Sequence, residues 1–319
     1  MPQRRLGRTS VHVSELGFGA APIAGLYEPV DEADAEATVA AAWDSGVRYF
    51  DTAPHYGVGL SETRLGRALA GRPRDELVVS TKVGRLLVPN PRPTGSDLAN
   101  GFAVPDDLVR RLDYSADGVR RSLESSLQRL GLERVDIVLV HDPDDHVEQA
   151  VAEALPALAS LRDEGVIGAI GVGMNQWQAP LRFVQESDVD VVMVAGRWTL
   201  VDRSAEPLLD ACAERGVSVL AAAPFNSGLL SADEPDGSGS YDYGPVPPAV
   251  LERARRCARA AREHGSTLPA AALHFPLRHP AVAAVVTGLR SVEQVTAAAG
   301  WLAHRLPDPY WAAVEATGQ

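Results

Sequence analysis

The stretch "VDIVLVH", residues 135–141, is largely aliphatic and ends on one ionisable side chain, His141. The same pattern recurs in "VRYFD" at 47–51, which ends on Asp51, and in "ELVVSTK" at 76–82. Runs this apolar are typical of strands that are buried on both faces of a parallel sheet. Five further runs have the same character: "ELGFG" (15–19), "IGAIGVG" (167–173), "VDVVMVA" (189–195), "VSVLAAA" (217–223) and "VAAVVTG" (282–288).

Helical patterns rich in Ala, Leu, Glu and Arg stand between these runs, and several end in glycine, as helix C-termini prefer. They include residues 31–46, 115–131, 147–165 and 248–265. Alternating β and α units imply a parallel sheet, and eight units in this length predict one (β/α)₈ barrel over residues 1–319. A doubly wound sheet would need a G-x-G-x-x-G turn after the first strand, and "GFGAAPIAG" lacks the third glycine.

Two long loops interrupt the rhythm, at 84–113 after the third strand and at 230–247 after the seventh. Both leave from the barrel face that carries active sites. Long loops of this kind are either functional lids or disordered segments. Tyr241 and Tyr243 lie in the second loop, and the sequence leaves both alternatives open for them.

The composition limits the classes of partner that this protein is expected to bind. The 319 residues carry a formal net charge of -12, which disfavours nucleic acid and anionic membranes as partners. Cys212 and Cys257 have no metal-binding or disulfide spacing, so we expect two reduced thiols. No secretory signal or membrane-length apolar stretch is present, so we expect a cytoplasmic protein, monomeric or homodimeric.

Three ionisable groups end three neighbouring predicted strands: Asp51, Lys82 and His141, with Tyr56 close behind the first. They are expected to meet at one rim of the barrel. A free tyrosine has a pKa near 10, and a neighbouring ammonium lowers that pKa. Lys82 would supply this charge, Asp51 would position Lys82, and His141 would hold the substrate oxygen.

Such a group moves protons to or from a carbonyl oxygen, but none of its members carries a hydride. The sequence therefore predicts a nicotinamide cofactor. A metal site at His141, Asp142, Asp144 and Asp145 is the alternative; because these residues crowd one loop, we expect no metal. We expect His55 to line the pocket rather than to act in catalysis.

Four motifs resemble those of the aldo-keto reductases: "YFDTAPHYG" (49–57), "VSTKVG" (79–84), "LVHDPD" (139–144) and "GVGMNQ" (171–176). The likeness begins at residue 4 and continues to "VTGLRSVEQV" at 286–295. It implies an N-terminal β-hairpin and a cofactor that lies extended over the barrel mouth. It also implies a catalytic tetrad of Asp51, Tyr56, Lys82 and His141, with Tyr56 as the acid–base.

Within that family, residues 51–69, 141–145 and 222–230 look most like the sugar dehydrogenases that act on L-fucose, D-threo-aldoses or L-galactose, together with a pyridoxal dehydrogenase. These relatives imply oxidation of an aldose at C1 to a lactone. The alternatives are pyridoxal oxidation, reduction of aldehydes or ketones with NADPH, and a non-catalytic, cofactor-binding regulatory subunit like those attached to some potassium channels.

The resemblance also transfers cofactor contacts one residue at a time. Asn175 matches the residue that hydrogen-bonds the nicotinamide carboxamide. The segment 223–229 matches the loop over the pyrophosphate, which makes candidates of Phe225, Ser227, Gly228 and Leu229. Where NADPH-dependent relatives carry several cations, this chain has Gly288 and Gln294 and keeps only Arg290. Loss of cations disfavours a 2′-phosphate, so we predict NAD, with NADP as the alternative.

Overall fold

Eight parallel strands close into a barrel in the computed structural model, which describes residues 1–242 and 244–316. Around the barrel the order is β3-β4-β5-β8-β9-β10-β11-β14, which follows the order of the chain. Each predicted run supplies one strand, so the (β/α)₈ prediction is confirmed. The strands are β3 (Leu16–Gly19), β4 (Tyr49–Asp51), β5 (Val78–Val83), β8 (Ile137–His141), β9 (Ala169–Met174), β10 (Val191–Ala195), β11 (Ser218–Ala222) and β14 (Val282–Gly288).

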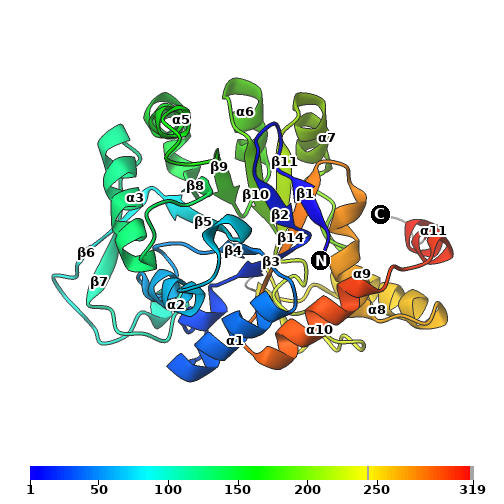
Figure 1. Cartoon of the computed structure of the whole chain (residues 1–319). Helices are drawn as coiled ribbons and strands as arrows, with labels where there is room; N and C mark the ends of the chain where they lie inside the picture. The colour runs from blue at the N-terminus through cyan, green and yellow to red at the C-terminus, as the bar shows by residue number, and fades with distance from the viewer. Residues whose placement is uncertain (243, 317–319) are drawn as a thin grey trace.

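Helices surround the barrel (Figure 1). They are α1 (Glu32–Asp44), α2 (Leu60–Leu69), α3 (Ala116–Leu130), α4 (Val147–Gln149), α5 (Leu155–Asp163), α6 (Gln178–Glu186), α7 (Glu206–Arg215), α8 (Pro248–Glu263), α9 (Leu268–His274), α10 (Val292–Ala303) and α11 (Asp308–Ala316). Local sequence sets their ends. At α3, for example, Ser115 Oγ accepts a hydrogen bond from the Gly118 N–H, and Gly131 ends the helix with φ +63°. The single helix predicted over 147–165 is divided by a π-helical turn at Ala150–Ala154.

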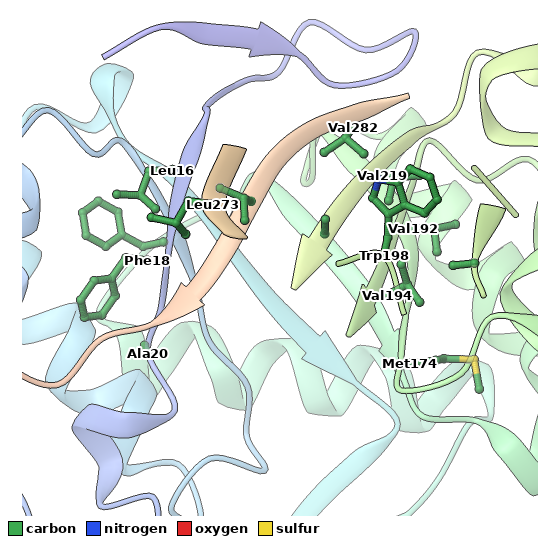
Figure 2. Packing of buried hydrophobic residues seen from close by; sticks show 14 of the residues in the cluster. Leu16, Phe18, Ala20, Met174, Val192, Val194, Trp198, Val219, Leu273 and Val282 are labelled. Atoms are coloured by element: carbon green, nitrogen blue, oxygen red, sulfur yellow. The ribbon is translucent and has the colours of Figure 1, made fainter. Parts of the chain in front are cut away.

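The core has two layers, because successive side chains of each strand point to opposite faces. Leu16 and Phe18 of β3 belong to the outer layer between strands and helices. Figure 2 shows them apart from the group around Trp198 in the same layer. Tyr49, Leu139 and other side chains fill the inside of the barrel. On β4 the alternation turns Phe50 outward and Tyr49 inward, and Asp51 therefore points inward as well.

An N-terminal hairpin packs against the barrel at the end where the strands begin, as the resemblance implied. It consists of β1 (Gln3–Arg5) and β2 (His12–Ser14), and Leu6 and Val13 join the inner hydrophobic layer. Gly7 has φ +52°, and a Cβ there would lie 2.6 Å from the Asp190 carbonyl oxygen. The strands finish at the opposite end of the barrel.

The length of the loop at 84–113 led us to expect an irregular segment, but the loop contains two paired strands. Strands β6 (Arg85–Pro89) and β7 (Leu108–Leu112) pair antiparallel from Arg85↔Leu112 to Pro89↔Leu108. The carboxylate of Asp106 accepts hydrogen bonds from the backbone of Thr94 and Gly95 and so holds the turn region. This hairpin extends beyond the ring of helices (Figure 1).

In the described part of the loop at 230–247, the short strands β12 (Ser240–Tyr241) and β13 (Gly244–Pro245) pair antiparallel. The Tyr241 hydroxyl donates to Asp202 over 3.1 Å, so this residue is anchored to the body of the protein. Tyr243 lies outside the described residues. No helix in the described part of the chain is long and apolar enough to cross a membrane.

Candidate active site

The strand tips bring together the four residues that the sequence predicted. Asp51, Lys82 and His141 end or nearly end the adjacent strands β4, β5 and β8. Lys82 Nζ donates to Asp51 Oδ2 over 2.7 Å, to the Tyr56 hydroxyl over 2.9 Å and to the Thr52 carbonyl over 3.1 Å. The Lys82 and Asp51 side chains are only 2% and 4% exposed. The ammonium thus connects a buried carboxylate to a phenol.

Burial and the charge of Lys82 have opposite effects on the pKa of Tyr56. Burial raises the pKa of the phenol, and the ammonium of Lys82 lowers it, but the net pKa lies above the usual value. The sequence predicted only the lowering effect of Lys82. Burial also lowers the pKa of Lys82, but Asp51 and Tyr56 outweigh it and raise that pKa overall. At neutral pH the site therefore holds an ammonium next to a neutral phenol.

His141 presents a neutral imidazole to the same space. Its ring centre lies 6.0 Å from that of Tyr56, and the two planes are 85° apart. Burial, followed by the charge of Lys82, lowers the pKa of His141 well below its usual value. Nε2 of His141 lies 3.5 Å from a carboxylate oxygen of Asp142. A neutral imidazole has one N–H group with which to hold a substrate oxygen.

A cleft of about 500 Å³ opens above these residues, and all eight barrel strands contribute to its lining. The contributing residues include Gly19, Asp51, Lys82, His141, Gly173, Ala195, Ala222 and Gly288. A larger hollow of about 830 Å³ lies at the other end of the barrel. Its arginines pair with carboxylates, as Arg74 does with Asp136 at 2.9 Å, and it contains none of the four predicted residues. The cleft at the strand tips is therefore the candidate active site.

Two residues behind Asp51 were missed in the sequence. Ser80 Oγ donates to Asp51 Oδ1 over 2.6 Å and lies 3.0 Å from the Tyr49 hydroxyl. Both side chains are fully buried. Each stands two positions before a predicted site residue on its strand, so the period of two would have placed both inside the barrel.

One wall of the cleft comes from the hairpin insertion and the loop after β4. The ring centres of His55 and Phe102 lie 5.5 Å apart, and His55 lies 5.7 Å from His141. Arg110 pairs with Asp97 and donates to the His55 carbonyl over 2.6 Å. The sequence predicted that His55 would line the pocket, which the structure confirms, but gave no sign of Phe102 or Arg110.

The predicted cofactor contacts fall into two groups. Asn175 and Gly288 line the cleft, and the Asn175 side chain is exposed there. The remaining candidates lie outside its lining. Ser227 and Gly228 are exposed with left-handed backbones, Phe225 packs partly buried near Trp301, and Leu229 is buried in the core.

Arg290, a cation near the end of β14, already has a partner. Arg290 forms an ion pair with Glu28, and its backbone N–H donates to Gln294 Oε1 over 3.0 Å. The adjacent hollow is lined by Asp31, Asp34 and Glu293 as well as Arg290. The local charge here is therefore acidic.

Two carboxylates of the acidic loop after His141 accept hydrogen bonds from neighbouring side chains. Asp142 accepts from Arg85 over 2.8 Å, and Asp144 accepts from Gln176 over 2.8 Å. Among the residues that the structure describes, no three His, Cys, Asp or Glu side chains form a group that could hold a metal ion.

Comparison with known proteins places the chain in a family. The model of the aldo/keto reductase family, whose members use NAD(P)H, matches residues 15–319. A D-threo-aldose 1-dehydrogenase from a Pseudomonas species is 48% identical, with 94% of this chain and 92% of the relative covered. A pyridoxal 4-dehydrogenase from Microbacterium luteolum is 39% identical, with 99% and 97% covered. The solved holo form of an aldo-keto reductase from Bacillus halodurans has a TM-score of 0.78 and 27% identity, with 100% and 97% covered. The chain is thus an oxidoreductase acting on a CH–OH or carbonyl group, and it belongs to the aldo/keto reductase family.

Proposed function

We propose that this enzyme oxidises an aldose at C1 to a lactone, with Tyr56 as the acid–base. The observation that carries the proposal is the buried chain Asp51–Lys82–Tyr56, with contacts of 2.7 and 2.9 Å, at the bottom of an open cleft. The 48% identity to a D-threo-aldose 1-dehydrogenase supports a sugar as substrate. The cleft also offers several polar groups for hydroxyls, among them Arg85, Asp142 and His55.

The chain's own residues have distinct roles in this mechanism. The N–H of neutral His141 holds the C1 oxygen of the sugar, and Tyr56 removes its proton. Lys82 favours the phenolate form of Tyr56, which becomes the phenol when it accepts the proton of the substrate hydroxyl. Asp51 fixes the position of Lys82, and Ser80 fixes Asp51 in turn. The chemistry that NAD(P) supplies when bound is hydride transfer.

The residues present fit such a cofactor. Small side chains at Gly173, Ala195 and Ala222 leave the mouth of the barrel open, and the Asn175 amide is exposed beside them. We infer that Asn175 binds the nicotinamide amide, that the segment 223–229 contacts the pyrophosphate, and that residues 288–294 meet the far ribose. Ala223, Ser227 and Gly228 of this segment have positive φ angles, and all three residues are exposed.

We propose NAD rather than NADP. Arg290 is the one cation that this chain keeps at the 2′ position, and it already pairs with Glu28. A 2′-phosphate would have to displace that carboxylate and approach Asp31 and Asp34. A 2′-hydroxyl brings no charge and meets no such opposition.

Two other readings use the same residues. Pyridoxal is the substrate named for the 39% identical relative, and its aldehyde would also reach Tyr56. Reduction of aldehydes or ketones is the reverse reaction, for which a neutral Tyr56 is the proton donor. We favour a cytoplasmic enzyme, monomeric or homodimeric, that acts on sugars and has no nucleic-acid partner, since its charge is acidic.

The test is absorbance at 340 nm with NAD or NADP against L-fucose, L-galactose, D-arabinose and pyridoxal. We expect NADH to form with at least one aldose, and the product to be a lactone. If no aldose is oxidised, turnover of pyridoxal would favour a pyridoxal dehydrogenase. Consumption of NADPH with simple carbonyls would instead favour a carbonyl reductase.

A further inference from the structure

An ion pair between Arg85 and Asp142 stands in the cleft beside His141. Arg85 Nη2 donates to Asp142 Oδ2 over 2.8 Å, and this same oxygen lies 3.5 Å from His141 Nε2. Both side chains line the cleft, and each is 19% exposed. We propose that this pair binds the hydroxyl on the carbon next to the reacting carbon, so that the enzyme selects 2-hydroxy aldehydes and aldoses over their 2-deoxy counterparts. The inference rests on the proposed function.

The backbone holds Asp142 in place for this role. Asp142 has φ +40°, in the left-handed region that a non-glycine residue rarely adopts. Its N–H donates to the Gly173 carbonyl over 3.0 Å, and the Tyr114 hydroxyl donates to the carbonyls of His141 and Asp142 over 2.8 and 2.9 Å. Strained residues persist where the surroundings over-determine them, and such residues gather at functional sites.

The position of the pair matches the geometry of a sugar. His141 Nε2 is the nitrogen beside Asp142, so a C1 oxygen held there lies close to the carboxylate. Oxygens on neighbouring sugar carbons are separated by about a hydrogen-bond length. A C2 hydroxyl therefore falls next to Asp142 Oδ2, where it can donate to the carboxylate and accept from Arg85.

The same wall leaves hydrogen-bonding capacity unused. Arg85 Nε and His55 Nδ1 are buried nitrogens that have no hydrogen-bond partner among the described residues. A substrate that lacks the C2 hydroxyl would exclude water from the ion pair and would leave the hydrogen bonds of that water unreplaced. A site built around polar groups discriminates strongly against a ligand that leaves them unpaired.

The test compares D-arabinose with its 2-deoxy counterpart, 2-deoxy-D-ribose, using NAD and the whole enzyme. In the wild type we expect kcat/KM to be about tenfold or more higher for the sugar with the C2 hydroxyl, as for a hydrogen bond to a charged group. Asp142→Asn should reduce this ratio, and Asp142→Ala should bring it close to one. Asp145→Asn changes an exposed carboxylate three residues away and should leave the ratio unaltered.

Equal use of the two sugars by the wild type, or a ratio that neither Asp142 variant alters, would overturn the inference. If no aldose is oxidised at all, the proposed function fails separately. The role of the Arg85–Asp142 pair is then tested in the reductive direction. The rates of NADH oxidation with glycolaldehyde and with acetaldehyde are compared, because these aldehydes differ in the same hydroxyl. A preference for glycolaldehyde that Asp142→Ala removes would support the inference, and no preference would refute it.

Discussion

Lys82 Nζ lies 2.9 Å from the hydroxyl of Tyr56 and 2.7 Å from the carboxylate of Asp51, inside a site almost closed to solvent. Through this contact the ammonium of Lys82 can activate the phenol of Tyr56. Asp51, at the tip of β4, compensates the buried charge of Lys82.

Tyr56→Phe removes the proton carrier and little else. We expect kcat to fall by about two to four orders of magnitude, as is typical for loss of a general acid–base. Coenzyme affinity, measured by titrating protein fluorescence, should stay within about twofold, because the phenol oxygen alone is removed. Tyr310→Phe is the matched control, since this buried hydroxyl lies on α11 outside the cleft and should not affect turnover. An active Tyr56→Phe enzyme would remove Tyr56 from the mechanism.

Removing one partner of the Asp51–Lys82 pair should lower the free energy of unfolding more than replacing both partners with uncharged residues. Lys82→Met leaves the buried carboxylate of Asp51 without its ammonium, so we expect the free energy of unfolding to fall by about 3–5 kcal/mol. The double variant Asp51→Asn/Lys82→Met has no buried charge and should recover much of that loss, although both variants should be inactive. Urea denaturation measures the stabilities. Additive losses in the double variant would mean that the two groups are not energetically coupled.

Oxidation should accelerate as the pH rises. Burial raises the pKa of Tyr56, so the phenolate that removes the proton forms mainly in alkaline solution, and each pH unit below that pKa lowers its fraction about tenfold. His141 has a pKa well below its usual value and stays neutral throughout. We expect kcat/KM for oxidation to rise from about pH 6 to pH 10. The reductive rate depends on the neutral phenol and should stay level over this range, falling only as the pH approaches the raised pKa of Tyr56. A profile that peaks near neutrality in both directions would contradict this assignment.

Much of the fold followed from the sequence because buried strands and amphipathic helices have different periods. The strands predicted at 47–51 and 135–141 ended where expected, and the one predicted at 76–82 ended one residue later, at Val83. Their polar tips met because adjacent parallel strands finish at one rim. The hairpin β6–β7 did not follow, since its strands pair only with each other and are half-exposed. The raised pKa of Tyr56 did not follow either, because burial of a loop residue depends on what packs over it.

Coenzyme choice should respond to Glu28. Glu28→Gln removes the carboxylate that pairs with Arg290 and frees the guanidinium for a 2′-phosphate. We expect kcat/KM with NADP to improve about tenfold relative to NAD, as for one charge-assisted contact. Glu36→Gln, an exposed change on α1, serves as the control and should alter neither value. No gain with NADP in the Glu28 variant would mean that Arg290 does not face the 2′ position.

Isotope transfer from C1 tests the central claim most directly. The enzyme is incubated with NAD and an aldose that carries deuterium only at C1, and the reduced coenzyme is analysed by mass spectrometry together with the sugar product. We expect one deuterium in NADH for every lactone formed, with formation of both abolished in Tyr56→Phe. Reduced coenzyme without deuterium, or a labelled product other than the lactone, would show that the cleft above Tyr56 does not oxidise the anomeric carbon.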